Sequence, residues 1–461
     1  MTPEFAVPVD PFSEYAMALE TDDYPKTDFT QFGFRGPVDV EALSESYREA
    51  LALVPTFSCH LRATRRGARY VPYWFRNAEQ PANHLVVEDC RHRVNGDFEP
   101  MEFSTRFHAR RTARRIDLTR EFPVTCYLIR VRDDQHIFSI LYHHSVVDGR
   151  KVFRLMNAML AGYHRRVTGR APAWADAPGM TALVRDGAVT PPAFRDFARE
   201  QLADLFTGTA RVAYVAGTGP RDVHGRYSFR EVIDDPGLLK GLRARVRANE
   251  ATLNDLLLAV ARVAIGQWND VRAAARERMR FMLITSLHGR TPLAEHGGAG
   301  VSALNFLSEG HGRADLDALV RFFRDRRTDQ LARGIDVAYH RTMARMVSAL
   351  RVFPLDARRA AVRAVAERVP CTFYLSNVGV LWPKVVDGRP TGDSAVLGAG
   401  KFRIDDVHSS ASVARNIGMG LTCRTHDRRF YLNFVADRWR FTKDEAQGFA
   451  RHFRKTLEDA G

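Results

Sequence analysis

The segment HIFSILYHHSVVDG, residues 136–149, has the pattern of a strand, a tight turn and the start of a helix in succession. β-Branched and aromatic residues dominate residues 136–144, and a similar run occupies residues 123–131, with the turn-forming sequence RDDQ between them. This pattern predicts a β-hairpin. Apolar residues then recur at helical spacing from Val152 to Tyr163, which predicts a helix that begins at Asp148-Gly149.

Two adjacent histidines end the predicted strand, and their side chains should point to opposite faces because successive strand residues alternate. A histidine at a strand end can project into a cleft, where an imidazole that titrates near neutral pH suits a general base. We expect only one of His143 and His144 to do so. Alternatively, either residue could be a buried core histidine whose ring nitrogens are hydrogen-bonded within the fold. A metal site is disfavoured because the two rings diverge and the sequence shows no cluster of further ligands.

Asp148 and Gly149 follow the histidines at a short, fixed spacing. A carboxylate often fixes the tautomer of a general-base histidine, and Asp148 could have this role. Alternatively, Asp148 pairs with a distant arginine and locks the turn. Gly149 allows the backbone to pass close to a ligand. The combination HHxxxDG rarely arises by chance in a chain of this composition, which favours a functional site.

The chain has 461 residues, of which 45% are hydrophobic, enough for two domains with separate cores. Residues 168–194 are rich in Pro, Gly and Ala and lack periodicity, so we place a boundary there, between an N-terminal lobe (1–180) and a C-terminal lobe (181–461). In the second lobe we expect helices capped by Thr252 and Thr442, a buried strand that leads into a loop within residues 280–290, and a hairpin over 416–437. Strands and helices in both lobes predict an α/β fold.

The formal net charge of +14 predicts that the surface attracts anions. The arginine runs interleave with apolar residues at helical spacing, so most should form solvated helix faces. No nucleic-acid-binding signature accompanies the charge, which favours an acidic protein or a phosphate-bearing thioester as the partner. The five cysteines form no CxxC pair and are expected to be buried and free. Neither a secretory leader nor a membrane-spanning run is evident, so we expect a soluble, cytoplasmic protein.

The motif HHSVVDG, preceded by IDLTREFPVTCYLIRVRDDQHIFSILY, resembles the active-site segment of the chloramphenicol-acetyltransferase-like superfamily. This superfamily includes nonribosomal-peptide condensation domains, polyketide-associated acyltransferases, wax-ester synthases and plant BAHD acyltransferases. The segments FRGPVDVEALSESYREALALVPTFSCHLR, ATLNDLLLAVARVAI, TSLHGRTPLAEHGGAGVSALNFLS and TFYLSNVGVLWP resemble further parts of these proteins. The resemblance covers most of the chain. The sequence DFGWG is absent, which disfavours a BAHD enzyme.

The resemblance implies two chloramphenicol-acetyltransferase-like lobes that form a V with a channel between them. It implies that His144 is the general base and that the amide of Gly149 stabilises the oxyanion. Asp148 would be a structural residue with Arg290 as its counter-ion, and His143 would stabilise the fold.

Three further residues match positions that border the channel in members of the superfamily. Ser376 and Asn377 match a Ser-Asn loop, and Asn305 matches a step in the segment that forms the floor of the channel. A direct role in catalysis or substrate binding is one interpretation. A turn or channel-wall role is the alternative.

The resemblance predicts a free-standing condensation-type acyltransferase that moves an acyl group from the phosphopantetheine thioester of an acidic acyl or peptidyl carrier protein to a hydroxyl or amine of a small-molecule acceptor. The alternatives are an acyl-CoA-dependent O- or N-acyltransferase, a hydrolase with the same base, and a non-catalytic module that recruits carrier proteins. We expect no tightly bound cofactor, no metal, no nucleic-acid partner and a monomeric state.

Overall fold

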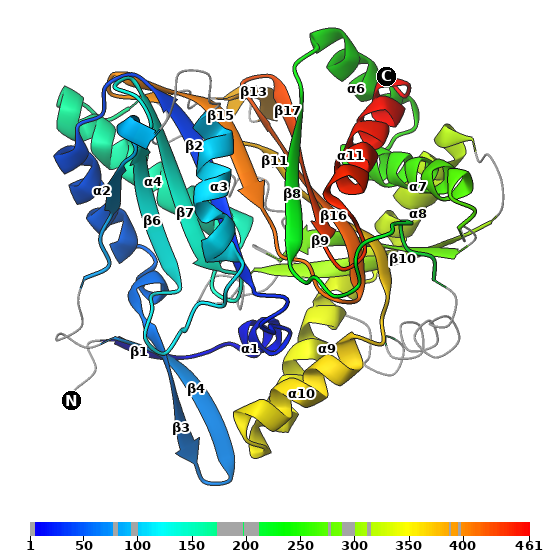
Figure 1. Ribbon diagram of the computed structural model, residues 1–461, viewed down its shortest axis with the longest axis horizontal. Coiled ribbons are helices and arrows are strands. Elements are labelled where there is room, and N and C mark those ends of the chain that lie inside the picture. The colour runs from blue at the N-terminus through cyan, green and yellow to red at the C-terminus, as the bar shows by residue number, and fades with distance from the viewer. Residues whose placement is uncertain are drawn as a thin grey trace.

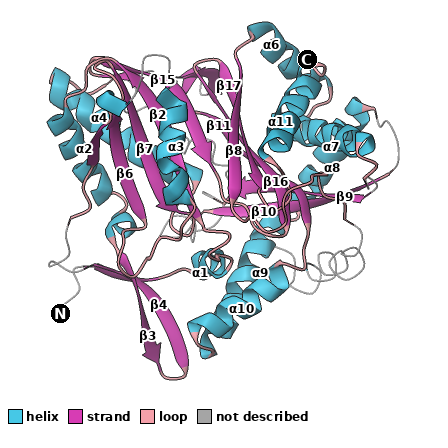
Figure 2. Cartoon of the chain, in the orientation of Figure 1, coloured by secondary structure: helices cyan, strands magenta, loops and turns pink. Residues whose placement is uncertain are grey.

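The computed structural model describes residues 5–76, 82–93, 100–172, 197, 212–274, 278–287, 300–310, 315–386, 389–394 and 398–461 (Figure 1). Two mixed six-stranded sheets dominate this part of the chain, and helices cover them (Figure 2). Each sheet and its helices form one lobe. The predicted α/β class and the two-lobed arrangement are therefore confirmed.

The first sheet is built mainly from the N-terminal part of the chain, in the strand order β14-β15-β2-β7-β6-β5. Its strands are β2 (Thr27–Arg35), β5 (Val86–Asp89), β6 (Val124–Arg130), β7 (Gln135–His143), β14 (Gly398–Ala399) and β15 (Phe402–Ser410). Strands β6 and β7 pair in antiparallel fashion, which confirms the predicted hairpin.

Helices cover both faces of the first sheet (Figure 1). On one face, α2 (Val40–Ala52) and α4 (Gly149–Thr168) share an apolar core with Phe32 of β2. On the other face, α3 (Pro100–Thr112) packs around Phe29 of the same strand. The alternation of β2 side chains thus fills both cores.

The second sheet has the strand order β10-β9-β11-β16-β17-β8. Its strands are β8 (Arg226–Ile233), β9 (Arg278–Ser286), β10 (Val301–Glu309), β11 (Cys371–Val380), β16 (Ile417–His426) and β17 (Arg429–Asp437). The helices of this lobe are α6 (Pro236–Ala248), α7 (Leu253–Val271), α8 (Leu316–Ala332), α9 (Ile335–Ala349), α10 (Leu355–Ala366) and α11 (Lys443–Glu458). Helices α7, α8 and α11 share one core with the sheet. Thr252 and Thr442 each cap a helix through a capping box, which confirms both predicted caps. Strands β16 and β17 pair in antiparallel fashion, which confirms the second predicted hairpin.

The two lobes are joined through β15, a strand that comes late in the sequence but lies in the first sheet. Strand β15 pairs antiparallel with β2, with Ile404 opposite Phe34 and Val407 opposite Phe32. The segment predicted as the C-terminal lobe therefore also supplies β14 and β15 to the first sheet. The boundary placed near residue 180 lies outside the described residues and stays a prediction.

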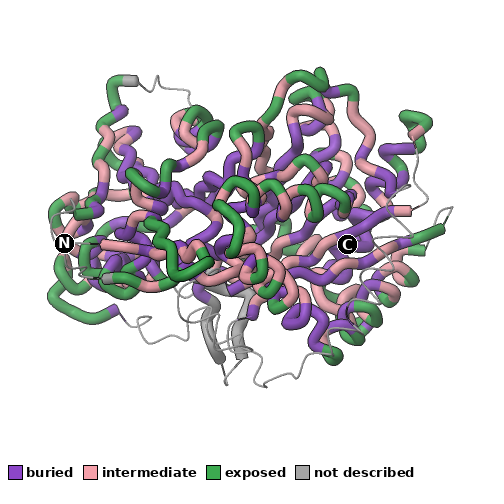
Figure 3. Tube along the Cα trace, turned by 90° about the horizontal axis from the view of Figure 1, so that it is seen from below, coloured by how far each residue is buried: buried purple, intermediate pink, exposed green. Residues whose placement is uncertain are grey.

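Smaller elements lie around the two lobes. Strands β1 (Phe5–Pro8), β3 (His60–Arg66) and β4 (Arg69–Arg76) form a separate sheet, and β12 (Pro383–Val386) pairs with β13 (Arg389–Ser394). Helix α1 (Pro11–Ala18) packs against α9 and α10. Buried residues follow the strands and the inner sides of the helices, and exposed residues lie at the periphery (Figure 3).

Two sequence predictions about the chain as a whole can be compared with the structure. The five cysteines are buried and free, as predicted. None of the helices in the described ranges is long and apolar enough to span a bilayer.

Candidate active site

The HHxxxDG motif lies where β7 ends and α4 begins. His143 is the last residue of β7, Asp148 is the N-cap of α4, and Gly149 is its first residue. The side chain of Asp148 accepts a hydrogen bond of 2.9 Å from the backbone N–H of Lys151. This cap explains why the helix begins here.

His144 has a partly exposed side chain, 41% accessible, whereas that of His143 is 0% accessible. The backbone N–H of His144 donates a 2.8 Å hydrogen bond to the carbonyl oxygen of Lys26. Its ring nitrogen Nδ1 lies 3.3 Å from Oδ2 of the buried Asp28. His144 is therefore anchored to the residue that directly precedes β2, and yet its side chain remains accessible, as that of a general base must be.

His143 is surrounded by protein groups on both sides of its ring. Its Nδ1 accepts a hydrogen bond of 3.2 Å from the backbone N–H of Ser145, and the hydroxyl of Ser145 lies 2.7 Å from the same nitrogen. Its Nε2 lies 3.3 Å from Oε2 of Glu20. Since Nδ1 is the acceptor, the proton of the neutral ring belongs on Nε2, which faces the carboxylate. This arrangement supports a structural role.

Glu20 lies at the centre of a buried charged cluster beneath the motif. Burial raises its pKa, but hydrogen bonding and attraction to His143, the backbone N–H of Lys26 and the charge of Arg115 outweigh burial and lower the pKa from 4.5 to about 2. Because the folded protein binds this proton less tightly than the unfolded chain, Glu20 stabilises the fold above pH 4.5. That contribution, on the order of 3 kcal/mol, is lost as the pH falls from 4.5 towards 2.

We therefore expect the variant Glu20→Gln to be less stable than the wild type at neutral pH, with a difference that shrinks on acidification. Urea unfolding of both proteins between pH 6 and pH 3 measures this, because this range covers the upper part of the loss that begins at pH 4.5. A difference in unfolding free energy that stays constant over this range would contradict the assignment.

Asp148 also connects the motif to the second lobe. Its Oδ2 accepts a hydrogen bond of 2.7 Å from the backbone N–H of Gly300, which directly precedes β10. The predicted counter-ion, Arg290, lies outside the described residues, so that pairing stays a prediction. Asp148 thus locks the turn through two backbone N–H groups on different lobes.

Gly149 begins α4, and the first N–H groups of a helix have no partner within the helix. This geometry suits the stabilisation of an oxyanion by the Gly149 amide. A Cβ atom added to Gly149 would lie 3.6 Å from Val378 of β11. Val378, which follows Asn377 in β11, therefore lies close to the motif.

Ser376 and Asn377 lie in strand β11 and not in a loop, which corrects the expectation drawn from the resemblance. The strand has a bulge between Asn377 and Gly379, where the Asn377 side-chain oxygen accepts a 2.8 Å hydrogen bond from the N–H of Gly379. The amide nitrogen Nδ2 of Asn377 donates to Asn254 of α7 over 2.7 Å. The bulge interrupts the regular pairing of β11 with β16 at Asn377.

Asn305 lies in β10, the edge strand of the second sheet, opposite Met282 of β9. Met282 in turn lies opposite Tyr374 of β11. Residues opposite one another share a face of a sheet, so Asn305 lies on the face that carries Tyr374 and, two residues further, Ser376. The role of these residues in substrate binding stays a prediction.

Sequence reasoning missed Asp28, Arg226 and Glu20. Asp28 and Arg226 form an ion pair in which Nη1 of Arg226 lies 3.1 Å from Oδ1 of Asp28. Asp28 stands inside the apolar pattern of β2, where a fully buried acid is unusual. That unusual position is the signal that could have pointed to Asp28.

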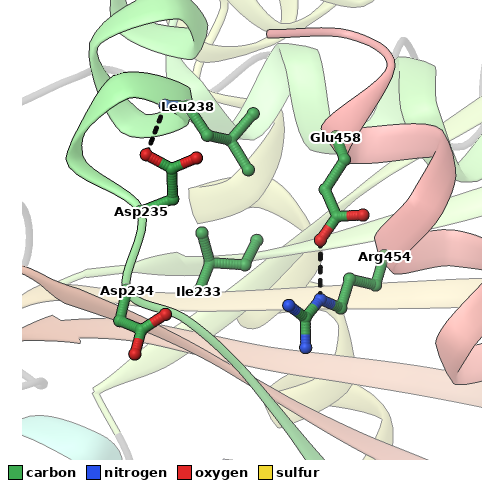
Figure 4. Close-up of a pocket in the computed structure, with 6 residues that line it drawn as sticks. All are labelled: Ile233, Asp234, Asp235, Leu238, Arg454 and Glu458. Atoms are coloured by element: carbon green, nitrogen blue, oxygen red, sulfur yellow. Dashed lines mark hydrogen bonds and ion pairs between the residues drawn. The ribbon is translucent and has the colours of Figure 1, made fainter.

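A pocket of about 310 Å³ lies on the second lobe (Figure 4). It is lined by Ile233, Asp234, Asp235, Leu238, Arg454 and Glu458. Asp235 caps α6 and Arg454 pairs with Glu458 over 2.8 Å, so these charged groups already have structural partners. The pocket contributes no residue to the candidate active site.

Comparison with known proteins gives two short sequence matches, and no protein-family model matches the chain. The isonitrile lipopeptide synthase of Mycobacterium tuberculosis is 40% identical over 62 residues, which are 13% of this chain and 2% of that protein. A probable non-canonical nonribosomal peptide synthetase of Salinispora arenicola, CymA, is 29% identical over 158 residues, which are 31% of this chain and 2% of that protein. The match thus spans only 2% of the length of either relative.

Solved structures match over nearly the whole chain. The first condensation domain of the calcium-dependent antibiotic synthetase, in complex with a substrate analogue, has a TM-score of 0.70 at 14% identity and covers 99% of this chain and 96% of that one. The epimerization domain of the third module of tyrocidine synthetase B has a TM-score of 0.65 at 12% identity and covers 100% and 97%. Polyketide synthase associated protein 5 of Mycobacterium tuberculosis has a TM-score of 0.59 at 12% identity and covers 98% of both chains. The chain therefore has the two-lobed chloramphenicol-acetyltransferase-like fold in the form found in condensation domains.

Proposed function

We propose that this protein is a condensation-type acyltransferase that moves an acyl group from the phosphopantetheine thioester of a carrier protein to a hydroxyl or amine acceptor. The observation that carries the proposal is the position of His144. This histidine is anchored through its backbone N–H to Lys26, directly before β2, its Nδ1 faces a buried carboxylate, and its side chain remains 41% accessible.

The reaction uses His144 first as a base and then as an acid. The acceptor O–H or N–H transfers its proton to Nε2 of His144 as the oxygen or nitrogen attacks the thioester carbonyl carbon. The carbonyl oxygen becomes an oxyanion, which the amide of Gly149 at the start of α4 stabilises. The C–S bond then breaks, and the departing thiolate takes the proton from His144. The products are an ester or amide and a free pantetheine thiol.

The charge of the protein favours a carrier protein as the donor. A formal net charge of +14 accelerates the encounter with an acidic partner through long-range attraction. The printed descriptions of the two curated relatives, a lipopeptide synthase and a nonribosomal peptide synthetase, support the same assignment to natural-product assembly. CoA is also an anion, so acyl-CoA-dependent transfer is the second candidate.

Two other candidates use the same fold. An epimerization domain shares it, which shows that the fold alone does not fix the reaction. The other candidate is a non-catalytic module that recruits carrier proteins. The accessible side chain of His144, next to the capped start of α4, argues against such a module.

A donor-competition assay tests the proposal. The protein is incubated with acyl-carrier protein or with the same acyl group on CoA, each with a panel of amines and alcohols, and the product is measured by mass spectrometry. We expect product from the carrier-bound donor, with a kcat/KM that falls as ionic strength rises. If only the acyl-CoA donor gives product, the protein is an acyl-CoA-dependent acyltransferase. If the protein binds the carrier protein but turns over no donor, it is a recruitment module.

A further inference from the structure

Asp28 is a fully buried carboxylate directly beside the candidate base. It lies in β2 opposite Tyr142 of β7, one position from the pairing of Thr27 with His143. Its Oδ2 lies 3.3 Å from Nδ1 of His144. A buried carboxylate costs free energy unless an ionic or hydrogen-bonding partner compensates it, so its position next to the ring calls for an explanation.

The partner of Asp28 comes from the other lobe. Arg226 is the first residue of β8, and its side chain is only 8% accessible. Its Nη1 lies 3.1 Å from Oδ1 of Asp28, and its Nη2 donates a hydrogen bond to the carbonyl oxygen of Thr27. One guanidinium therefore holds both the side chain of Asp28 and the backbone next to it.

The ring of His144 lies within ion-pairing distance of Asp28, and its backbone is held next to β2. The backbone N–H of His144 donates a hydrogen bond to the carbonyl oxygen of Lys26, which directly precedes β2 and lies two residues before Asp28. With the backbone fixed and Nδ1 turned to the carboxylate, Nε2 lies on the opposite side of the ring. A carboxylate that accepts from one ring nitrogen keeps the proton there and leaves the lone pair on the other.

We propose that Asp28 is a positioning residue that holds His144 as the Nδ1–H tautomer, and that Arg226 fixes Asp28 from the second lobe. The base is thus assembled from both lobes, and its Nε2 is free to accept a proton. The catalytic consequence of this arrangement rests on the proposed function, but the tautomer itself does not.

A second ion pair between the lobes provides a matched control. Arg230 lies on the same strand β8, four residues after Arg226, and pairs with Asp406 of β15. Both side chains are about one fifth accessible, at 19% and 21%. Removal of this pair disturbs the contact between lobes, but it leaves the partners of His144 in place.

The tautomer is measured by ¹⁵N NMR on protein labelled at histidine, with the signal of His144 assigned by its absence in His144→Gln. In the wild type we expect a protonated Nδ1 and an unprotonated Nε2 at a pH where the ring is neutral. In Asp28→Asn we expect the Nε2–H form to become populated, because the amide can donate to Nδ1 and no longer favours a proton there. Arg226→Met is expected to shift the tautomer in the same direction, and Arg230→Met is expected to leave it unchanged.

Kinetics with the same variants give the second readout. We expect Asp28→Asn and Arg226→Met to lower kcat by roughly 10- to 100-fold with little change in KM. Arg230→Met is expected to stay within about twofold of the wild type, because Arg230 pairs with Asp406 and not with His144 or Asp28.

The outcomes separate this inference from the proposed function. An Nε2–H tautomer in the wild type would overturn the inference, even if an ion-pair variant failed to fold. An equal effect of Arg230→Met and Arg226→Met would overturn the role of Arg226 in favour of general lobe packing. If the tautomer is as expected but no donor is turned over, the inference on Asp28 holds and the proposed function is wrong. If the tautomer is as expected but His144→Ala retains full turnover, the tautomer inference holds and the base has been assigned to the wrong residue.

Discussion

Replacement of His144 by alanine is expected to lower kcat/KM for acyl transfer about 10³-fold, within the range that removal of a general base produces. The physical reason is that no proton acceptor then stands next to the attacking hydroxyl or amine. The fold should be unaffected, because His144 is anchored through its backbone N–H, which alanine retains, and its side chain is 41% accessible. Rates with the carrier-bound donor and the best acceptor measure this effect.

An exposed histidine gives the control for that experiment. His84 is exposed, and its ring contacts the carbonyl oxygen of Ala82 on the surface of the first lobe. We expect His84→Ala to keep wild-type kinetics. Wild-type turnover in His144→Ala would show that the base has been assigned to the wrong residue.

Replacement of Asp148 by alanine is expected to destabilise the fold strongly. It removes the helix cap at the N–H of Lys151 and the acceptor for the N–H of Gly300. A lost cap costs about 1 kcal/mol, and a buried N–H without a partner costs about 1–3 kcal/mol. We therefore expect the free energy of unfolding to fall by about 2–4 kcal/mol.

Activity should fall in the same variant because the turn that carries His144 and Gly149 is held by Asp148. Urea unfolding and steady-state kinetics measure the two effects. Asp148→Asn retains a side-chain oxygen that can cap α4, so it should be intermediate in both measurements. Equal stability of Asp148→Ala and the wild type would mean that the two hydrogen bonds contribute nothing measurable.

Local sequence patterns predicted the elements that carry the site. The hairpin β6–β7, the start of α4 at Asp148 and the caps at Thr252 and Thr442 each depend on a few neighbouring residues, and all are confirmed. Such features follow from backbone propensities and hydrogen bonding within one or two turns of chain.

The parts that could not be predicted depend on residues far apart in the sequence. Asp28 and Arg226 are separated by most of the first lobe, and only the folded structure brings them together beneath His144. The pairing of β15 with β2 is similar, because nothing local in residues 402–410 indicates the sheet to which this strand belongs. Arg290 and the predicted lobe boundary lie outside the described residues.

Strand β15 comes late in the sequence but belongs to the first sheet, and this restricts how the protein can be recombined with others of its fold. A chimera made by a single crossover near residue 180 would pair β2 with a foreign β15, and a register that does not match would expose an open strand edge to other chains. A workable exchange of the first half must therefore carry residues 398–410 with it, as a second inserted block. The units that evolution or an engineer can swap are defined by the sheet and not by the order of the chain.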